Sequence, residues 1–183
     1  MTAKLTLREI ADLFNDLDAV DDPQEREARY QKLRQILQAR MIISDVAVSR
    51  GKTAAFSDVK IGHLRLLQAL IDSGFKGPVL WQFNAFLTGL SGMTKAGTGP
   101  GTAIAQAVEG IRNGEDWILT VRITRSLLSG ELEFLGRLRR VDDLVLPRSR
   151  RSLDSGRVIY SEVSLPATAL ILPILEYLQS VTP

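Results

Sequence analysis

The chain of 183 residues contains no cysteine and a single histidine, His63. The missing thiols exclude disulfides, thiolate metal sites and thiol redox switches, and one histidine excludes a metal site built from several histidines. No run of about 18 apolar residues occurs, and no positive head precedes an apolar stretch at the start, so neither a membrane span nor a secretory signal is expected. We therefore expect a cytoplasmic protein with no metal, no other cofactor and no membrane partner.

The composition that remains is that of an ordinary globular protein, with 45% hydrophobic and 24% charged residues. The formal net charge is only +2, but the charges are unevenly spread along the chain. Residues 1–25 contain two basic and seven acidic side chains, whereas residues 26–65 contain nine basic and three acidic ones. A basic segment favours attraction to phosphate, because this attraction depends on the local field. The alternative is a solvated helix face with scattered arginines.

Two helices are predicted before residue 42. The segment Thr6-Leu7-Arg8-Glu9 has the sequence of a capping box and predicts a first helix over residues 7–14. The acidic stretch 15–22 is expected to be a loop. Pro23 suits a helix start and opens a second helix that runs to about Arg40. The buried stripe of this second helix should consist of Ala28, Leu33, Ile36, Leu37 and Met41.

A basic, glycine-centred segment follows the second helix. Residues 42–48 are expected to form a strand, Arg50-Gly51-Lys52 the tip of a β-hairpin, and residues 53–56 the returning strand. Ser57 then suits the N-cap of a third helix, and Gly74 suits its C-terminal end. The third helix should bury Ile61, Leu64, Leu67, Leu70 and Ile71. Helices followed by a hairpin and another helix are the element order of a winged helix, which points to duplex DNA.

The resemblance to a known family is carried by Leu33-Arg34, Met41-Ile42, the basic hairpin tip, Asp58-Val59 and Gly74-Phe75. In this order, residues 5–75 resemble the winged-helix DNA-binding domain of MerR-type regulators. The resemblance implies that the second helix enters the major groove and that the wing grips the DNA backbone. It places Arg34 on the recognition helix, and Arg50 and Lys52 on the wing.

The sequence also departs from that family. The span from Ile10 to Leu33 is roughly ten residues longer than a tight helix-turn-helix, whose turn has about three to four residues. The tyrosine pair that usually follows the recognition-helix arginine is replaced by Gln35-Ile36. The family's long dimerising coiled coil does not follow Phe75, and its metal-sensing cysteines are missing. The effector half would therefore be of another kind.

The second half of the chain has a different character. Its last helix contains Pro173, which should kink or divide it. The apolar stripe of this helix, between Leu170 and Leu178, is the candidate surface for self-association, and the alternative is that it covers the sheet. The other expected elements are a helix over residues 79–90 that packs under the winged domain, a Gly-rich linker over 91–101, a helix over 102–112, and strands over 117–124, 132–138 and 157–163.

The sequence thus predicts an α+β protein in three parts. A winged helix-turn-helix domain occupies residues 1–78, a short helix and Gly-rich linker occupy 79–101, and an α+β module for dimerisation or sensing occupies 102–183. We expect a transcriptional regulator that binds double-stranded DNA as a homodimer and is not an enzyme. The expected DNA-binding residues are Arg29, Tyr30, Arg34, Arg50 and Lys52.

Two other functions stay open at this point. One is an architectural or recombination-accessory factor that uses the same wing. The other is a protein–protein adaptor, which the acidic residues 1–25 favour because they would repel DNA if they lay on the same face. The basic segment 148–151 is a second DNA contact, an anion site or, as we expect, an exposed loop without a role. A hydrolase or transferase would have to use the second half, where no residue pattern indicates one.

Overall fold

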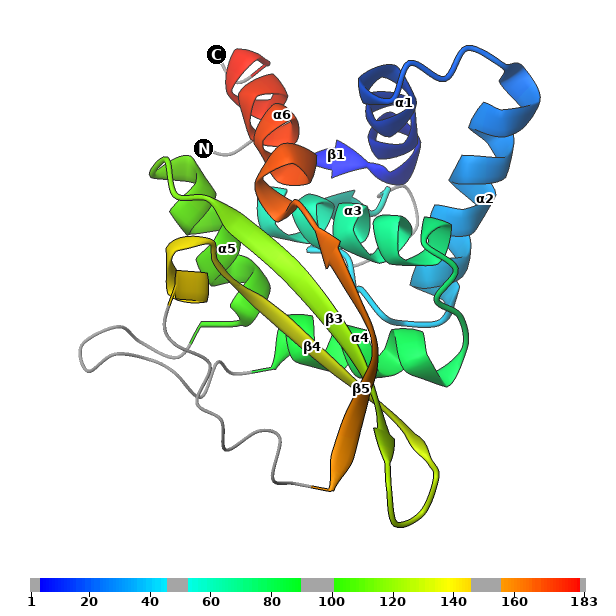
Figure 1. Cartoon of the computed structure of the whole chain (residues 1–183). Helices are drawn as coiled ribbons and strands as arrows, with labels where there is room; N and C mark the ends of the chain where they lie inside the picture. Colours follow the sequence, from blue (N-terminus) through cyan, green and yellow to red (C-terminus); the bar gives the residue numbers. More distant parts are fainter. Residues whose placement is uncertain (1–3, 46–52, 90–100, 146–155, 182–183) are drawn as a thin grey trace. The chain divides into compact units, whose positions relative to one another are not determined.

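The computed structural model describes residues 4–45, 53–89, 101–145 and 156–181 (Figure 1). These residues form α-helices and two small antiparallel sheets, so the predicted α+β class is confirmed. The chain divides into two compact units. We call Met1–Gly74 with Ala169–Pro183 the N-terminal unit, and Phe75–Thr168 the sheet unit.

The N-terminal unit is built around three helices and a two-stranded sheet. Thr6 caps the first helix as predicted: its hydroxyl accepts a hydrogen bond from the Glu9 backbone N–H (3.4 Å), and the Glu9 carboxylate accepts one from the Thr6 N–H (2.7 Å). The third helix is buried on nearly every side and ends before Gly74, whose φ of 92° suits glycine. The elements are β1 (Leu5–Thr6), α1 (Leu7–Leu17), α2 (Pro23–Gln38), β2 (Ala55–Phe56), α3 (Asp58–Asp72) and most of α6 (Ala167–Ser180).

Three local predictions for this unit were wrong. Residues 15–17 continue α1, so that only residues 18–22 separate α1 from α2. Ala28 is exposed, because Leu33 and Ile36 define the buried side of α2. Residues 42–45 are not a strand.

The returning strand of the expected hairpin has a different partner from the one predicted. β2 pairs with the N-terminal strand β1 in antiparallel register, with Leu5 opposite Phe56 and Thr6 opposite Ala55. One backbone hydrogen bond joins the two sides of the expected hairpin, from the Asp45 N–H to the Ala55 carbonyl (2.9 Å). Residues 46–52, which include Arg50 and Lys52, lie outside the described residues.

The sheet unit contains a three-stranded antiparallel sheet in the order β4-β3-β5. Its strands and the helix at 103–112 match the predictions. Helix α4 belongs to the sheet unit, where it contacts β4 and α5, and not to the unit that contains the predicted winged domain. Gly136 lets α4 approach β4 closely, since a Cβ there would lie 2.9 Å from the Phe86 ring and 3.1 Å from the Phe83 ring. The elements are α4 (Pro78–Thr88), α5 (Ala103–Arg112), β3 (Trp117–Ser126), β4 (Leu132–Arg140), η1 (Asp142–Val145) and β5 (Arg157–Leu165).

The last helix, α6, runs through Pro173 without being divided. Its apolar stripe is buried at Ile171, Ile174, Leu175 and Leu178. The stripe therefore does not leave the open face that self-association through this helix would need. None of the helices in the described ranges is both long and apolar enough to cross a membrane.

Candidate nucleic-acid interface

Helix α2 has one buried side and one exposed side. Leu33 and Ile36 point into the core of the N-terminal unit. The exposed side follows a spacing of three and four residues, which places its members next to one another along the helix surface. Its members, which we call the outer face of α2, are Gln31, Arg34, Gln35 and Gln38.

The side chains of the outer face are of the kinds that pair with base edges. A glutamine amide can donate to and accept from adenine, and an arginine fork can donate twice to guanine. Gln31 is held by its neighbour, since its amide donates to the Glu27 carboxylate (2.7 Å). Within the part of the chain that the structure describes, the side chains of Arg34, Gln35 and Gln38 form no hydrogen bond or ion pair. Three adjacent donor groups on one helix are thus available to a ligand.

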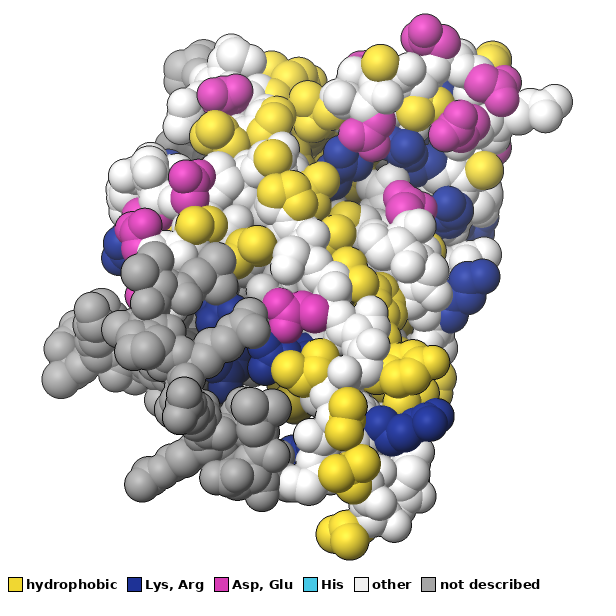
Figure 2. Space-filling model, in the orientation of Figure 1, with side chains coloured by type: hydrophobic (Ala, Val, Ile, Leu, Met, Phe, Trp, Pro, Cys, Tyr) yellow, Lys and Arg dark blue, Asp and Glu magenta, His cyan; other side chains and the backbone are white. Residues whose placement is uncertain are grey.

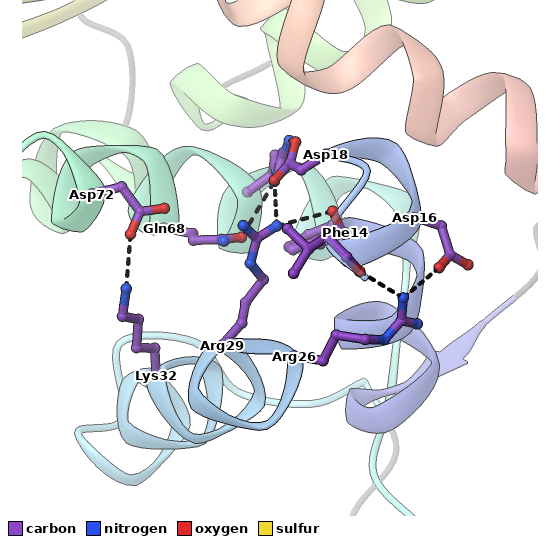
Figure 3. A network of polar contacts seen from close by, with 10 residues as sticks. Phe14, Asp16, Asp18, Arg26, Arg29, Lys32, Gln68 and Asp72 are labelled. Carbon is purple, nitrogen blue, oxygen red and sulfur yellow. Dashed lines mark hydrogen bonds and ion pairs between the residues drawn. The ribbon is translucent and has the colours of Figure 1, made fainter. Parts of the chain in front are cut away.

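The inner side of α2 is attached to the rest of the unit by Arg29 (Figure 3). Its guanidinium donates to the Phe14 carbonyl at the end of α1 (3.0 Å) and to the Asp18 carboxylate in the turn. The Asp18 carboxylate also accepts hydrogen bonds from both terminal nitrogens of Arg65 on α3, one of them at 2.8 Å. A single carboxylate therefore joins α2 and α3 at the turn that precedes α2.

Arg65 is the most buried member of this cluster, with its side chain 9% exposed. Its guanidinium lies over the Phe14 ring, 5.0 Å from the centroid, and donates to the Gln68 amide oxygen (3.4 Å). Burial disfavours the charged form of Asp18, but the hydrogen bonds and charges of Arg65 and Arg29 outweigh it and lower the pKa of the carboxyl below its ordinary value. Asp18 is thus ionised at neutral pH, whereas the buried Nε of Arg65 has no hydrogen-bond partner among the described residues.

Three further side-chain contacts join α2 to its neighbours, and Figure 3 shows those of Arg26 and Lys32. Arg26 donates to the Asp16 carboxylate and to the Val20 carbonyl, both at 3.0 Å. Arg8 on α1 donates to Glu27 on α2 at 2.8 Å. Helix α2 is tied to α3 near its C-terminal half by Lys32 and Asp72, 3.1 Å apart.

These ion pairs bring together the acidic and basic segments that are separate along the sequence. The acidic residues of α1 and the following turn lie against the basic residues of α2 and α3, so the two oppositely charged segments neutralise each other in space. The prediction of a separate basic region was therefore wrong for most of α2. Arg34 and Arg40 are exceptions, because they are exposed and form no ion pair within the described ranges.

The three predicted DNA-binding residues that the structure describes do not share one exposed face. Arg34 belongs to the outer face of α2, whereas Arg29 is turned inward and its side chain is 12% exposed. Tyr30 is half-buried, with the Arg8 guanidinium 4.9 Å above its ring centroid. Arg50 and Lys52 lie outside the described residues. Sequence reasoning missed Gln31, Gln35 and Gln38, although their spacing from Arg34 along a helix would have indicated a shared face.

The segment that enters α3 is fixed by Asp45. Its carboxylate accepts a hydrogen bond from the Ser57 N–H (2.5 Å) and forms an ion pair with Lys60 (2.7 Å). Burial opposes the charge on Asp45, but these contacts lower its pKa below the ordinary value. Asp45 therefore anchors both sides of the segment that contains the predicted wing.

Within the ranges that the structure covers, no group of three or more histidine, aspartate or glutamate side chains could hold an ion. His63 is buried within α3.

No protein-family model matches the chain, and no curated protein matches it either.

Proposed function

We propose that the N-terminal unit binds double-stranded DNA through the outer face of α2, and that the protein is a winged-helix transcriptional regulator of the MerR type. The observation that carries the proposal is the arrangement of α2. Its inner side is anchored by Arg29, while its outer face presents Arg34, Gln35 and Gln38 without partners in the described chain. A rigidly held helix with free arginine and glutamine side chains suits the major groove.

The order of the elements supports the same proposal. Helices α1 and α2 are separated by the five residues 18–22, a turn slightly longer than the three to four residues or so of a tight helix-turn-helix. The pairing of β2 with β1 brings the return of the predicted wing beside the start of α1. The entry to α3 is fixed by Asp45, so a wing between residues 45 and 55 would be held at its base.

Each exposed residue then has a defined role. Arg34 would donate to a guanine, and Gln35 and Gln38 would pair with adenines. Arg40, which follows the C-cap of α2, and the predicted wing residues Arg50 and Lys52 would contact phosphates. Arg29 and Tyr30 would position α2 and would not read bases.

The competing function is a protein–protein adaptor. It is favoured by the neutralisation of most arginines of α2, which removes much of the attraction to phosphate. The outer face of α2 is rich in neutral amides, and a protein partner can also bind such groups. The two functions differ in their response to salt, because only DNA binding releases counterions from a nucleic acid.

The discriminating experiment measures binding to a labelled duplex of random sequence by fluorescence anisotropy, across a salt series. Wild type is compared with Arg34→Ala and with the matched control Lys32→Ala. Both variants remove one positive charge from α2, but Lys32 faces Asp72 of α3. We expect Arg34→Ala to weaken binding by roughly tenfold and Lys32→Ala to change it little.

Two results would oppose the proposal. Absence of binding at low salt would favour the adaptor. Equal losses in Arg34→Ala and Lys32→Ala would show that net charge, and not the outer face of α2, determines affinity.

A further inference from the structure

The three-stranded sheet has one face toward α4 and an opposite, more polar face. A Cβ at Gly136 would meet the Phe83 and Phe86 rings of α4, and the register partner of Gly136 on β3 is Val121. Because side chains alternate along a strand, the neighbours of Val121 point away from α4. The strands pass in front of α4 in Figure 1, and Figure 2 shows Lys and Arg side chains gathered along this part of the sheet, next to an acidic side chain. We call this side the polar face of the sheet.

A row of three polar side chains crosses the polar face from one edge of the sheet to the other. Thr120, in the central strand β3, lies directly opposite Arg137 of β4 and directly opposite Ser164 of β5. Neighbouring strands are about 4.8 Å apart, so side chains in register on one face are immediate neighbours. We call Arg137, Thr120 and Ser164 the donor row, because each of them can donate a hydrogen bond.

The Thr120 hydroxyl is buried and has no partner. The residue is only 6% exposed, and its Oγ1 forms no hydrogen bond within the part of the chain that the structure describes. Arg137 and Ser164 are exposed, and their side chains likewise form no hydrogen bond or ion pair among the described residues. A buried hydroxyl without a partner costs stability, and such groups are rare unless a bound water, ion or ligand satisfies them.

The charges around the donor row favour an anion. Glu162 lies on the polar face two residues before Ser164, but it is paired with Arg122 of β3 at 2.7 Å. Glu133, further along β4, is paired with Arg157 at 3.0 Å. Both carboxylates thus have basic partners, whereas the charge of Arg137 is not neutralised by any described residue.

We propose that the donor row binds a phosphate group. A guanidinium and two hydroxyls can each donate to a different oxygen of one phosphate, which has more acceptor oxygens than a carboxylate. Arg137 supplies the charge and the geometry that arginine offers to phosphate. The Thr120 hydroxyl gains the partner that the described residues do not provide. The site lies in the sheet unit, and the inference does not depend on the DNA-binding proposal.

Thr124 provides a comparison within the same strand. It lies on the polar face four residues after Thr120, is 5% exposed, and its Oγ1 also has no partner in the described chain. Its register partner on β4 is Glu133 and not an arginine. A carboxylate at that position repels an anion, so the two threonines should differ in phosphate binding although they are equally buried.

The experiment is an NMR titration of the full chain with inorganic phosphate at constant ionic strength, in which backbone amide signals are followed. The signals of the donor row should shift and saturate, with a dissociation constant on the order of 1 mM. Thr120→Val keeps the shape of the side chain and should raise this constant by roughly tenfold, whereas Thr124→Val should leave it unchanged. Thermal unfolding checks the fold of both variants, since replacing an unpartnered buried hydroxyl by a methyl group should not lower the midpoint.

The charge is tested by a second matched pair. Arg137→Gln should raise the dissociation constant by roughly tenfold or more, because a charge-assisted hydrogen bond is lost. Arg125→Gln removes the same charge from another exposed arginine, near the end of β3, and should leave the constant unchanged. Absence of a saturating shift up to about 50 mM phosphate would overturn the proposal. Equal effects of Thr120→Val and Thr124→Val, or of the two arginine variants, would also overturn it.

Two further probes distinguish the source of the phosphate group. If ribose 5-phosphate binds more tightly than inorganic phosphate and loses affinity in Thr120→Val, the ligand is a small phosphate ester. If only a single-stranded oligonucleotide shows both properties, the phosphate belongs to a nucleic-acid backbone. Affinities that are the same in Thr120→Val and wild type for every probe would contradict a site at the donor row.

Discussion

Asp18, in the turn between α1 and α2, accepts hydrogen bonds from both terminal nitrogens of Arg65, which lies 47 residues later on α3. This contact joins the part of the chain that precedes α2 to the most buried helix of the N-terminal unit. Arg29 reaches the same carboxylate from α2 itself. This carboxylate therefore contributes to fixing the position of α2, and hence of its outer face.

The first prediction follows from the burial of Arg65. Asp18→Ala leaves a nearly buried guanidinium without its ionic partner, and should lower the free energy of unfolding by about 3 kcal/mol. Asp16→Ala is the matched control, because its partner Arg26 is more exposed, and should cost only about 0.5 kcal/mol. Urea unfolding followed by circular dichroism measures both values. Equal costs would show that Asp18 is no more important than a surface ion pair.

The second prediction concerns pH. The folded-state pKa of Asp18 lies below its ordinary value of 3.8, so the unfolded chain binds more protons in acid. Its contribution to stability is therefore complete above about pH 5 and is lost as the pH falls through the folded-state pKa. Asp45 acts in the same direction, since its pKa is also lowered. Urea unfolding between pH 3 and pH 7 should show a smaller pH dependence for Asp18→Asn than for wild type, and an unchanged slope would contradict the assignment.

The third prediction compares two helix starts. Thr6 caps α1 through its hydroxyl, whereas Ser57 occupies the same position before α3 without a side-chain capping bond. Thr6→Ala should therefore destabilise the protein by about 1 kcal/mol, and Ser57→Ala by clearly less. Thermal unfolding of the two variants decides the matter. A larger cost for Ser57→Ala would be the opposite of the expected order.

The fourth prediction concerns the wing. Arg50→Ala/Lys52→Ala should weaken DNA binding and reduce the slope of log affinity against log salt by roughly one to two units, because up to two phosphate contacts are lost. Arg148→Ala/Arg150→Ala removes the same charge from the other basic segment and should leave the slope unchanged. If the two double variants behaved alike, no special role could be given to the wing.

Much of the secondary structure could be predicted from local signals. The capping box at Thr6, the proline that opens α2 and the alternation along β3 depend on residues that lie close together in the chain. Such signals act through hydrogen bonds and packing within one element, so the sequence alone is enough to find them. The α+β class followed from the same signals.

The long-range relationships could not be predicted in this way. Nothing local to Phe56 indicates that its strand pairs with Leu5, and nothing local to Arg65 indicates that it binds Asp18. The charge argument failed for the same reason, because counting along the chain cannot show that Arg29 and Asp18 meet. The glutamines of α2 could have been predicted from their helical spacing relative to Arg34, but the charge pattern does not include them because they are neutral.

The most direct test of the central claim is an NMR titration of the full chain with duplex DNA at low salt, in which the side-chain amides of glutamine are observed. The account predicts that the signals of Gln35 and Gln38 shift or broaden, because these side chains would meet base edges. The chemical shifts and line widths of the side-chain amide signals of Gln82 on α4 and Gln106 on α5 should not change. If DNA binds while Gln35 and Gln38 remain unchanged, the outer face of α2 is not the surface that reads it.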